Sequence, residues 1–99
     1  MTGSEKQIKW AEDIANRAFE HIDCMVITFK HFIEIGEDPV DWCGYDLEAV
    51  EDLRAQVTAA IKKVEKASTI IEKRNRLTQS HLEKIARAIT ANRKKADVK

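Results

Sequence analysis

Apolar residues recur at every third or fourth position along the first third of the chain, and charged residues fill the positions between them. The repeat runs from Ile8 to Phe32 without a Gly or Pro, and Gly36 follows it. This spacing places the apolar side chains on one face of a helix. The pattern predicts one long helix over residues 5–35, about 46 Å long at roughly 1.5 Å per residue.

Both ends of this helix carry capping residues. Ser4 and Gln7 have the spacing of a capping box, in which the Ser4 hydroxyl accepts from the Gln7 amide and the Gln7 side chain reaches back. Gly36 suits the left-handed residue that ends many helices. The local sequence therefore predicts where the helix begins and where it stops.

The helical repeat resumes after a short interruption and predicts a second helix over residues 47–74, with Asp46 as its N-cap. Residues 69–72 have the pattern of a capping box of their own. A kink or break near Ser68 is therefore an alternative to one continuous helix.

A third, shorter helix is predicted over residues 80–92, where Ser80 and Glu83 form another capping box. Residues 93–99 are expected to be a frayed basic tail. Since no segment has the alternating pattern of a strand, the predicted fold class is all-α.

The helix lengths predict how these elements pack in a single domain over residues 1–99. Two near-equal helices joined by a loop at residues 36–46 are expected to form a long antiparallel hairpin. The third helix would complete a three-helix bundle by covering the start of the first helix, over Ile8 and Ile14.

The second half of the first helix carries a second stripe of residues beside its main apolar face. Cys24, Ile27, Thr28, His31 and Ile35 follow one another at helical spacing, so they line up along the helix. A helix that is apolar on two sides needs two partners. The stripe therefore predicts a further packing surface.

The loop at residues 36–46 contains Val40, Trp42 and Tyr45, which are unfavourable in water. Trp42 is predicted to be mostly buried against Ile27, His31 and Ile35. An aromatic ligand site is the functional alternative. If the end of the bundle stays uncovered, the candidate interaction surface consists of Ile27, His31, Ile35, Trp42 and Tyr45.

Composition supports a helical domain and excludes some locations. The charged fraction is 34%, with three Gly and one Pro, which is typical of long helices. No apolar run reaches the ~18–20 residues of a membrane span, and the N-terminus has no signal-peptide pattern. These features predict a cytoplasmic protein with no membrane partner, in which Cys24 and Cys43 are free thiols rather than a disulfide.

Charge is balanced overall but divided unevenly. Residues 1–53 contain thirteen acidic residues and four basic ones, and residues 54–99 contain thirteen basic residues and four acidic ones. The two halves would attract each other in an antiparallel hairpin; alternatively, the basic half binds nucleic acid. The candidate nucleic-acid contacts are Lys73, Arg74, Arg76, Lys84 and Arg87.

The sequence offers little catalytic or metal-binding chemistry. His21 and Cys24 are three residues apart on the first helix, and Cys43 or His81 would have to join them to bind zinc. The predicted fold places Cys43 and His81 near opposite ends. No nucleophile lies next to a base, and no Gly-rich phosphate loop is present. We therefore expect no catalytic residues, no metal, no cofactor and no enzyme activity.

The opening residues resemble those of a known group of proteins. Ser4-Glu5-Lys6-Gln7-Ile8-x-Trp10-Ala11 is similar to the start of small uncharacterised proteins from bacteria and their phages. Some of those proteins carry a later motif of the form Ala-x-Phe-Trp-Ile-Asp-x-Arg. Residues 67–74 occupy a comparable place, with Thr69 and Ile70 where the motif has aromatic residues. The resemblance implies a bacterial or phage origin and no particular chemistry.

Two functions remain as hypotheses. The first is a non-enzymatic helical structural or protein-interaction module, which binds a protein partner or a second copy of itself through its apolar end. The alternative is a nucleic-acid-binding accessory protein that uses the basic C-terminal half.

Overall fold

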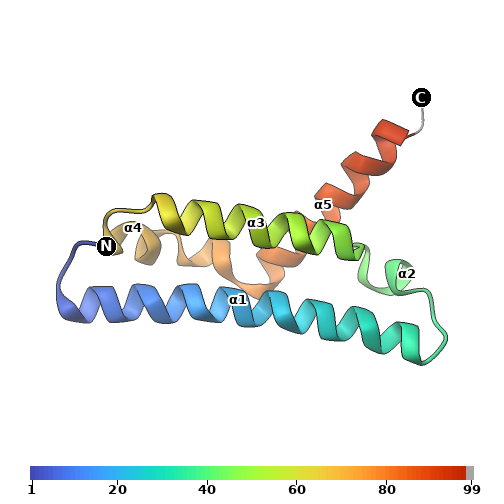
Figure 1. The fold of residues 1–99 in the computed structure, drawn as a ribbon, viewed down its shortest axis with the longest axis horizontal. Helices are drawn as coiled ribbons and strands as arrows, with labels where there is room; N and C mark the ends of the chain where they lie inside the picture. The colour runs from blue at the N-terminus through green and yellow to red at the C-terminus, as the bar shows by residue number, and fades with distance from the viewer. Residues whose placement is uncertain (98–99) are drawn as a thin grey trace.

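The computed structural model describes residues 1–97, and every regular element within that range is a helix (Figure 1). The α-helices are α1 (Glu5–Glu34), α2 (Pro39–Cys43), α3 (Leu47–Lys63), α4 (Ala67–Glu72) and α5 (Gln79–Asp97), and a short 3₁₀-helix η1 (Arg74–Leu77) links the last two. The predicted all-α helical bundle is confirmed. The described residues form five α-helices instead of the three that the sequence predicts.

Helix α1 begins and ends as its local sequence predicts. The Gln7 amide donates to the Ser4 hydroxyl, and the Ser4 amide donates to the Gln7 side chain, both at 3.2 Å. At the other end Gly36 adopts a left-handed φ of 79°, and its amide donates to the carbonyl of Ile33 at 3.1 Å. A glycine takes this conformation without the strain that a Cβ would cause.

Helices α1 and α3 form the predicted antiparallel hairpin (Figure 1). Asp46 caps α3, because its side chain accepts a hydrogen bond of 2.8 Å from the amide of Ala49. The inner face of α3 buries Val50, Leu53 and Val57. Packing of this face against α1 holds the hairpin together through removal of apolar surface from water.

The second predicted helix does not run to residue 74. Helix α3 ends at Lys63, and the chain reverses at residues 64–66, upstream of Ser68 (Figure 1). The amide of Thr2 donates to the carbonyl of Glu65 at 2.6 Å, and the amide of Ala67 donates to the carbonyl of Thr2 at 2.8 Å. The second bond satisfies the first N–H of α4, which the start of a helix leaves unpaired, and the first pairs the Glu65 carbonyl between the two helices.

The reversal decides which element covers the first half of α1. Helix α4 packs there, and Ala67 and Ile70 are buried in a small cluster with Ala11. The expectation that the third predicted helix covers Ile8 and Ile14 is therefore wrong. Small side chains on both helices allow the close approach, and a Cβ on Gly3 would already lie 3.2 Å from the Cβ of Ala67.

Helix α5 is longer than the predicted third helix. It begins at Gln79 after Thr78, whose hydroxyl accepts a hydrogen bond of 3.4 Å from the amide of His81, so Ser80 is not the cap. It continues to Asp97, which makes most of the expected tail at residues 93–99 helical. The rest of that tail, residues 98–99, lies outside the described residues. Figure 1 shows α5 crossing the hairpin and projecting beyond it.

The main core lies where α5 crosses the hairpin. Leu82 and Ala86 of α5 are fully buried there, with side chains of α1, α3 and the segment between them. The buried residues of this cluster are Ala18, Ile22, Met25, Phe29, Cys43, Tyr45, Ala49, Val50, Leu53, Val57, Leu82 and Ala86. The core is therefore displaced toward one end of the hairpin.

Ion pairs connect the acidic first half of the chain to the basic second half. Arg54 binds Asp23 at 2.8 Å, and Arg93 binds Asp46 at 2.9 Å and also contacts Glu48. The predicted attraction between the halves is thus visible at two places. Such exposed pairs each contribute at most about 1 kcal/mol.

Candidate protein-interaction surface

The second stripe of α1 lies on the outside of the bundle. Ile27 is 67% exposed, Ile35 is 55% exposed, and His31 is exposed between them. The periodicity predicted a second apolar stripe, and the structure confirms that it is separate from the buried face of α1. Within the described residues, no helix packs over it.

Trp42 does not cover the stripe as the sequence predicts. Residues 39–43 form one helical turn, which the side chain of Asp38 caps by accepting from the amide of Val40 at 3.0 Å. Val40 and Cys43 are three positions apart and both turn toward the core. Trp42 then points outward and is 63% exposed. The expectation of a buried Trp42 is wrong because a helical turn, and not an irregular loop, sets its direction.

Trp42 instead forms an aromatic row with two side chains of α1. Its ring stacks on Phe32 with centroids 5.6 Å apart and planes inclined by 3°. The imidazole of His31 lies 6.0 Å from the ring of Phe32. The indole N–H donates to the carboxylate of Glu37 at 3.4 Å. These contacts fix the orientation of the exposed indole ring.

Tyr45 belongs to the core and not to this surface. Its side chain is only 2% exposed. Gly44 precedes it with φ of 79°, and the Nε–H of Arg87 donates to the carbonyl of Cys43 at 2.9 Å, so the chain turns inward under the Arg87 side chain. A Cβ at Gly44 would lie 3.2 Å from that side chain. The assignment of Tyr45 to an interaction surface is therefore wrong.

The burial of Tyr45 makes stability depend on pH in the alkaline range. Burial, and then the neighbouring Cys43, raise the pKa of the phenol well above its ordinary value of 10.0. The unfolded chain therefore loses this proton at a lower pH than the folded chain does. The stabilising contribution is complete below about pH 10 and is lost as the pH rises above that value.

We expect Tyr45→Phe to remove this dependence. Between pH 9 and pH 11 the unfolding free energy of the native chain should fall by about 1 kcal/mol more than that of the variant. Urea titrations followed by circular dichroism measure both. If the unfolding free energies of the two proteins instead changed in parallel with pH, Tyr45 would ionise as readily in the folded chain as in the unfolded one.

Acidic side chains surround the exposed aromatic row. Glu34, Glu37, Asp38 and Asp41 are all exposed, and Lys30 is the one lysine or arginine among residues 27–42. In the part of the chain that the structure describes, none of these four carboxylates has an ion-pair partner within 4.0 Å. We use the term acidic–aromatic end for Ile27, His31, Phe32, Ile35 and Trp42 together with these four carboxylates.

The structure does not bring the five candidate nucleic-acid contacts onto one face. Arg74 donates to the carbonyl of Ile71 at 2.7 Å and lies 5.5 Å from the ring of Trp10. Arg87 is held on the carbonyl of Cys43 at the other end of the core, and Lys84 is exposed on α5.

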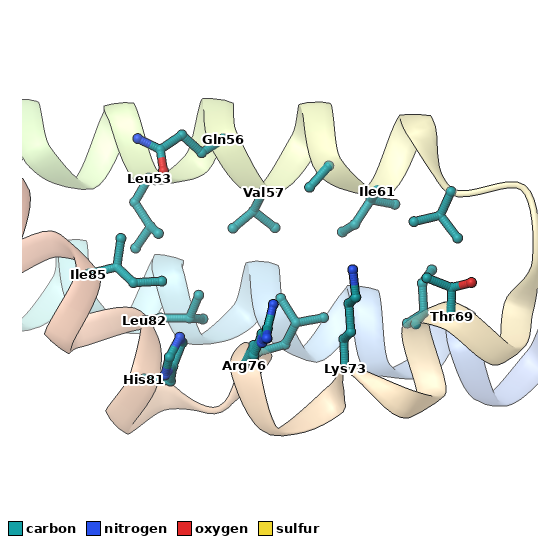
Figure 2. A pocket seen from close by; sticks show the side chains of 14 residues that line it. Leu53, Gln56, Val57, Ile61, Thr69, Lys73, Arg76, His81, Leu82 and Ile85 are labelled. Atoms are coloured by element: carbon teal, nitrogen blue, oxygen red, sulfur yellow. The ribbon is translucent and has the colours of Figure 1, made fainter.

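Lys73 and Arg76 are the two candidate contacts that line a common cleft. His81 lines it beside them (Figure 2). The sequence suggests His81 only as a metal ligand. Its position next to two cations was not foreseen, because it depends on the reversal of the chain.

The candidate metal ligands stay apart. Cys24 is exposed on α1, Cys43 is buried on α2, and both are free thiols. No group of three His, Cys, Asp or Glu side chains in residues 1–97 is arranged to hold a metal ion.

The fold and these surfaces define the chain as a small helical bundle with an exposed acidic–aromatic end. No protein-family model, curated protein or solved structure matches it. None of the helices in the described range is both long and apolar enough to cross a membrane.

Proposed function

We propose that the protein is a non-enzymatic interaction module whose acidic–aromatic end binds a partner segment that is apolar and flanked by Lys or Arg. The observation that carries this proposal is the 63% exposure of Trp42 beside the exposed Ile27 and Ile35. Large aromatic side chains are enriched at the centres of protein interfaces, since they bury much area with little loss of conformational freedom. The bacterial or phage origin that the opening motif implies stays a prediction.

The charge around the aromatic row favours a basic partner over a second copy of the chain. Two copies meeting through the same surface would bring Glu34, Glu37, Asp38 and Asp41 of both molecules together. Like charges brought together in this way oppose association. A partner with cations at its rim would instead pair with these carboxylates and associate faster at low salt.

We expect a synthetic amphipathic helix to serve as a probe of this surface. The probe carries Leu at positions i, i+3, i+4 and i+7 and Lys elsewhere, with a fluorescein label, and its anisotropy reports binding. Trp42→Ala should weaken binding about tenfold or more, because Trp42 is the largest exposed apolar side chain of the surface. The stability of the variant should fall by only about 1 kcal/mol, the value of one exposed aromatic pair.

A matched control uses the other tryptophan. Trp10 is also half exposed, at 48%, but lies near the opposite end of α1. Trp10→Ala should leave binding of the probe unchanged, and a second peptide with Glu in place of Lys should not bind. Equal losses from both tryptophan variants would contradict the proposal. A mass that doubles with concentration in light scattering would point to a second copy as the partner.

Nucleic-acid binding by the basic half remains the alternative proposal. Of the five candidate contacts, Lys73 and Arg76 line a common cleft, and Arg74 and Arg87 each donate to a backbone carbonyl. Retention on duplex DNA that falls steeply with salt would favour this alternative.

A further inference from the structure

A cleft separates α3 from the segment formed by α4, η1 and the start of α5 (Figure 2). Its volume is about 400 Å³. Val57 and Ile61 of α3 line one side, and Leu77 and Ile85 line the other. Pockets of roughly 300–1,000 Å³ with mostly apolar walls are typical sites for small molecules.

The cleft is a consequence of how the chain reverses. Helix α4 packs against α1, so it does not close the space beside α3. Ile61 and Leu77 pack against both the main core and the smaller cluster around Ala67, and the cleft lies over the junction of the two. Apolar side chains from both clusters are therefore accessible from this cleft.

Basic side chains line the same cleft as these apolar residues. Figure 2 shows Lys73, Arg76 and His81 projecting from one side of the cleft toward α3. The remaining polar residues that line the cleft, Gln56 and Thr69, are uncharged. In the described part of the chain, neither Lys73 nor Arg76 has a carboxylate within 4.0 Å. The cleft thus combines apolar walls with unneutralised positive charge.

We propose that this cleft binds a small amphiphile with one hydrocarbon tail and an anionic head group. The tail would lie on Ile61, Leu77 and Ile85, which line the cleft and are only half-buried, and the head group would accept hydrogen bonds from Lys73 and Arg76. An apolar ligand would not use the cations, and a fully polar anion would not use the walls. Only a ligand with both parts matches the whole site.

This site is separate from the acidic–aromatic end, and its test does not depend on the proposed function. Decanoate is the probe, added to the full chain below its micelle concentration and followed by titration calorimetry. We expect saturable binding whose affinity rises about fourfold for each methylene added between octanoate and decanoate, as burial of hydrocarbon requires. Amide chemical shifts in NMR should change around Ile61 and Leu77.

Two charge variants test the head-group contacts. Lys73→Met and Arg76→Met keep most of the apolar stem, so each should weaken decanoate binding about tenfold through loss of a charged hydrogen bond. Lys84→Met, which changes an exposed lysine outside the cleft, should leave the affinity unchanged. Decyl phosphate in place of decanoate shows whether a carboxylate or a phosphate head binds more tightly, and saturable binding of either supports the site.

A third variant fills the cleft without removing charge. Ala60 lines the cleft from the exposed side of α3, so Ala60→Phe should abolish decanoate binding while the circular dichroism spectrum stays native. Retained binding by this variant would overturn the proposal. Equal affinities for decanol and decanoate would also overturn it. Changes in amide chemical shifts centred on Ile27 and Trp42, and not on the cleft, would do the same.

Discussion

Leu82→Ala is expected to lower the free energy of unfolding by about 3 kcal/mol, because truncation of a fully buried leucine removes apolar contacts and leaves a cavity. Leu82 has no exposed surface and packs in the main core, where α5 meets α1 and α3. For a chain of 99 residues, a loss of this size should lower the melting temperature by roughly 12–24 °C. Urea unfolding followed by circular dichroism measures the loss of unfolding free energy. The slope of this free energy against urea concentration should stay unchanged if the variant keeps the native fold.

Ile27→Ala is the matched control for this prediction. It also shortens an aliphatic side chain in a helix, but Ile27 is mostly exposed. Its effect should stay within about 0.5 kcal/mol, as for most surface substitutions. Comparable losses from the two variants would mean that α5 does not dock on the hairpin through Leu82.

Ala67→Leu is expected to destabilise the fold by about 2–3 kcal/mol, because extra methyl groups at a close helix contact force the backbones apart. Ala67 is fully buried at the start of α4, in one cluster with Ala11. Its amide donates to the carbonyl of Thr2, so displacement of α4 should also weaken that hydrogen bond. Chemical denaturation gives the change in stability, and hydrogen exchange at the residue 67 amide reports the local contact.

Ala59→Leu provides the comparison for the second prediction. Ala59 lies on the exposed side of α3, where a larger side chain meets solvent. We expect its effect to be near zero. If Ala67→Leu were equally mild, α4 would have to pack on α1 less closely than the structure shows.

The acidic–aromatic end illustrates how far helical periodicity reaches. Spacing alone placed Ile27, His31 and Ile35 on one stripe, because the positions of side chains around a helix follow from its pitch. Spacing did not predict whether another element of the fold covers the stripe. That depended on the direction of Trp42, which is set by a single helical turn capped by Asp38.

The cleft was not predictable from the sequence at all. Its walls come from α3 and from a segment that returns along α1 after the reversal at residues 64–66. No Gly or Pro marks this reversal, and the residues around it continue a helical repeat. A continuous helix over residues 47–74 would have carried Lys73 and Arg76 away from Val57 and Ile61.

Local chemistry was enough to place the boundaries that depend on neighbouring residues. Ser4 and Gln7 start α1, Gly36 ends it, and Asp46 starts α3, because each cap satisfies backbone groups within a few positions of itself. The reversal at residues 64–66 has a different cause. Its unpaired backbone groups are satisfied by Thr2, which is distant in sequence and arrives only when α1 and α4 pack together, so only the tertiary structure could decide it.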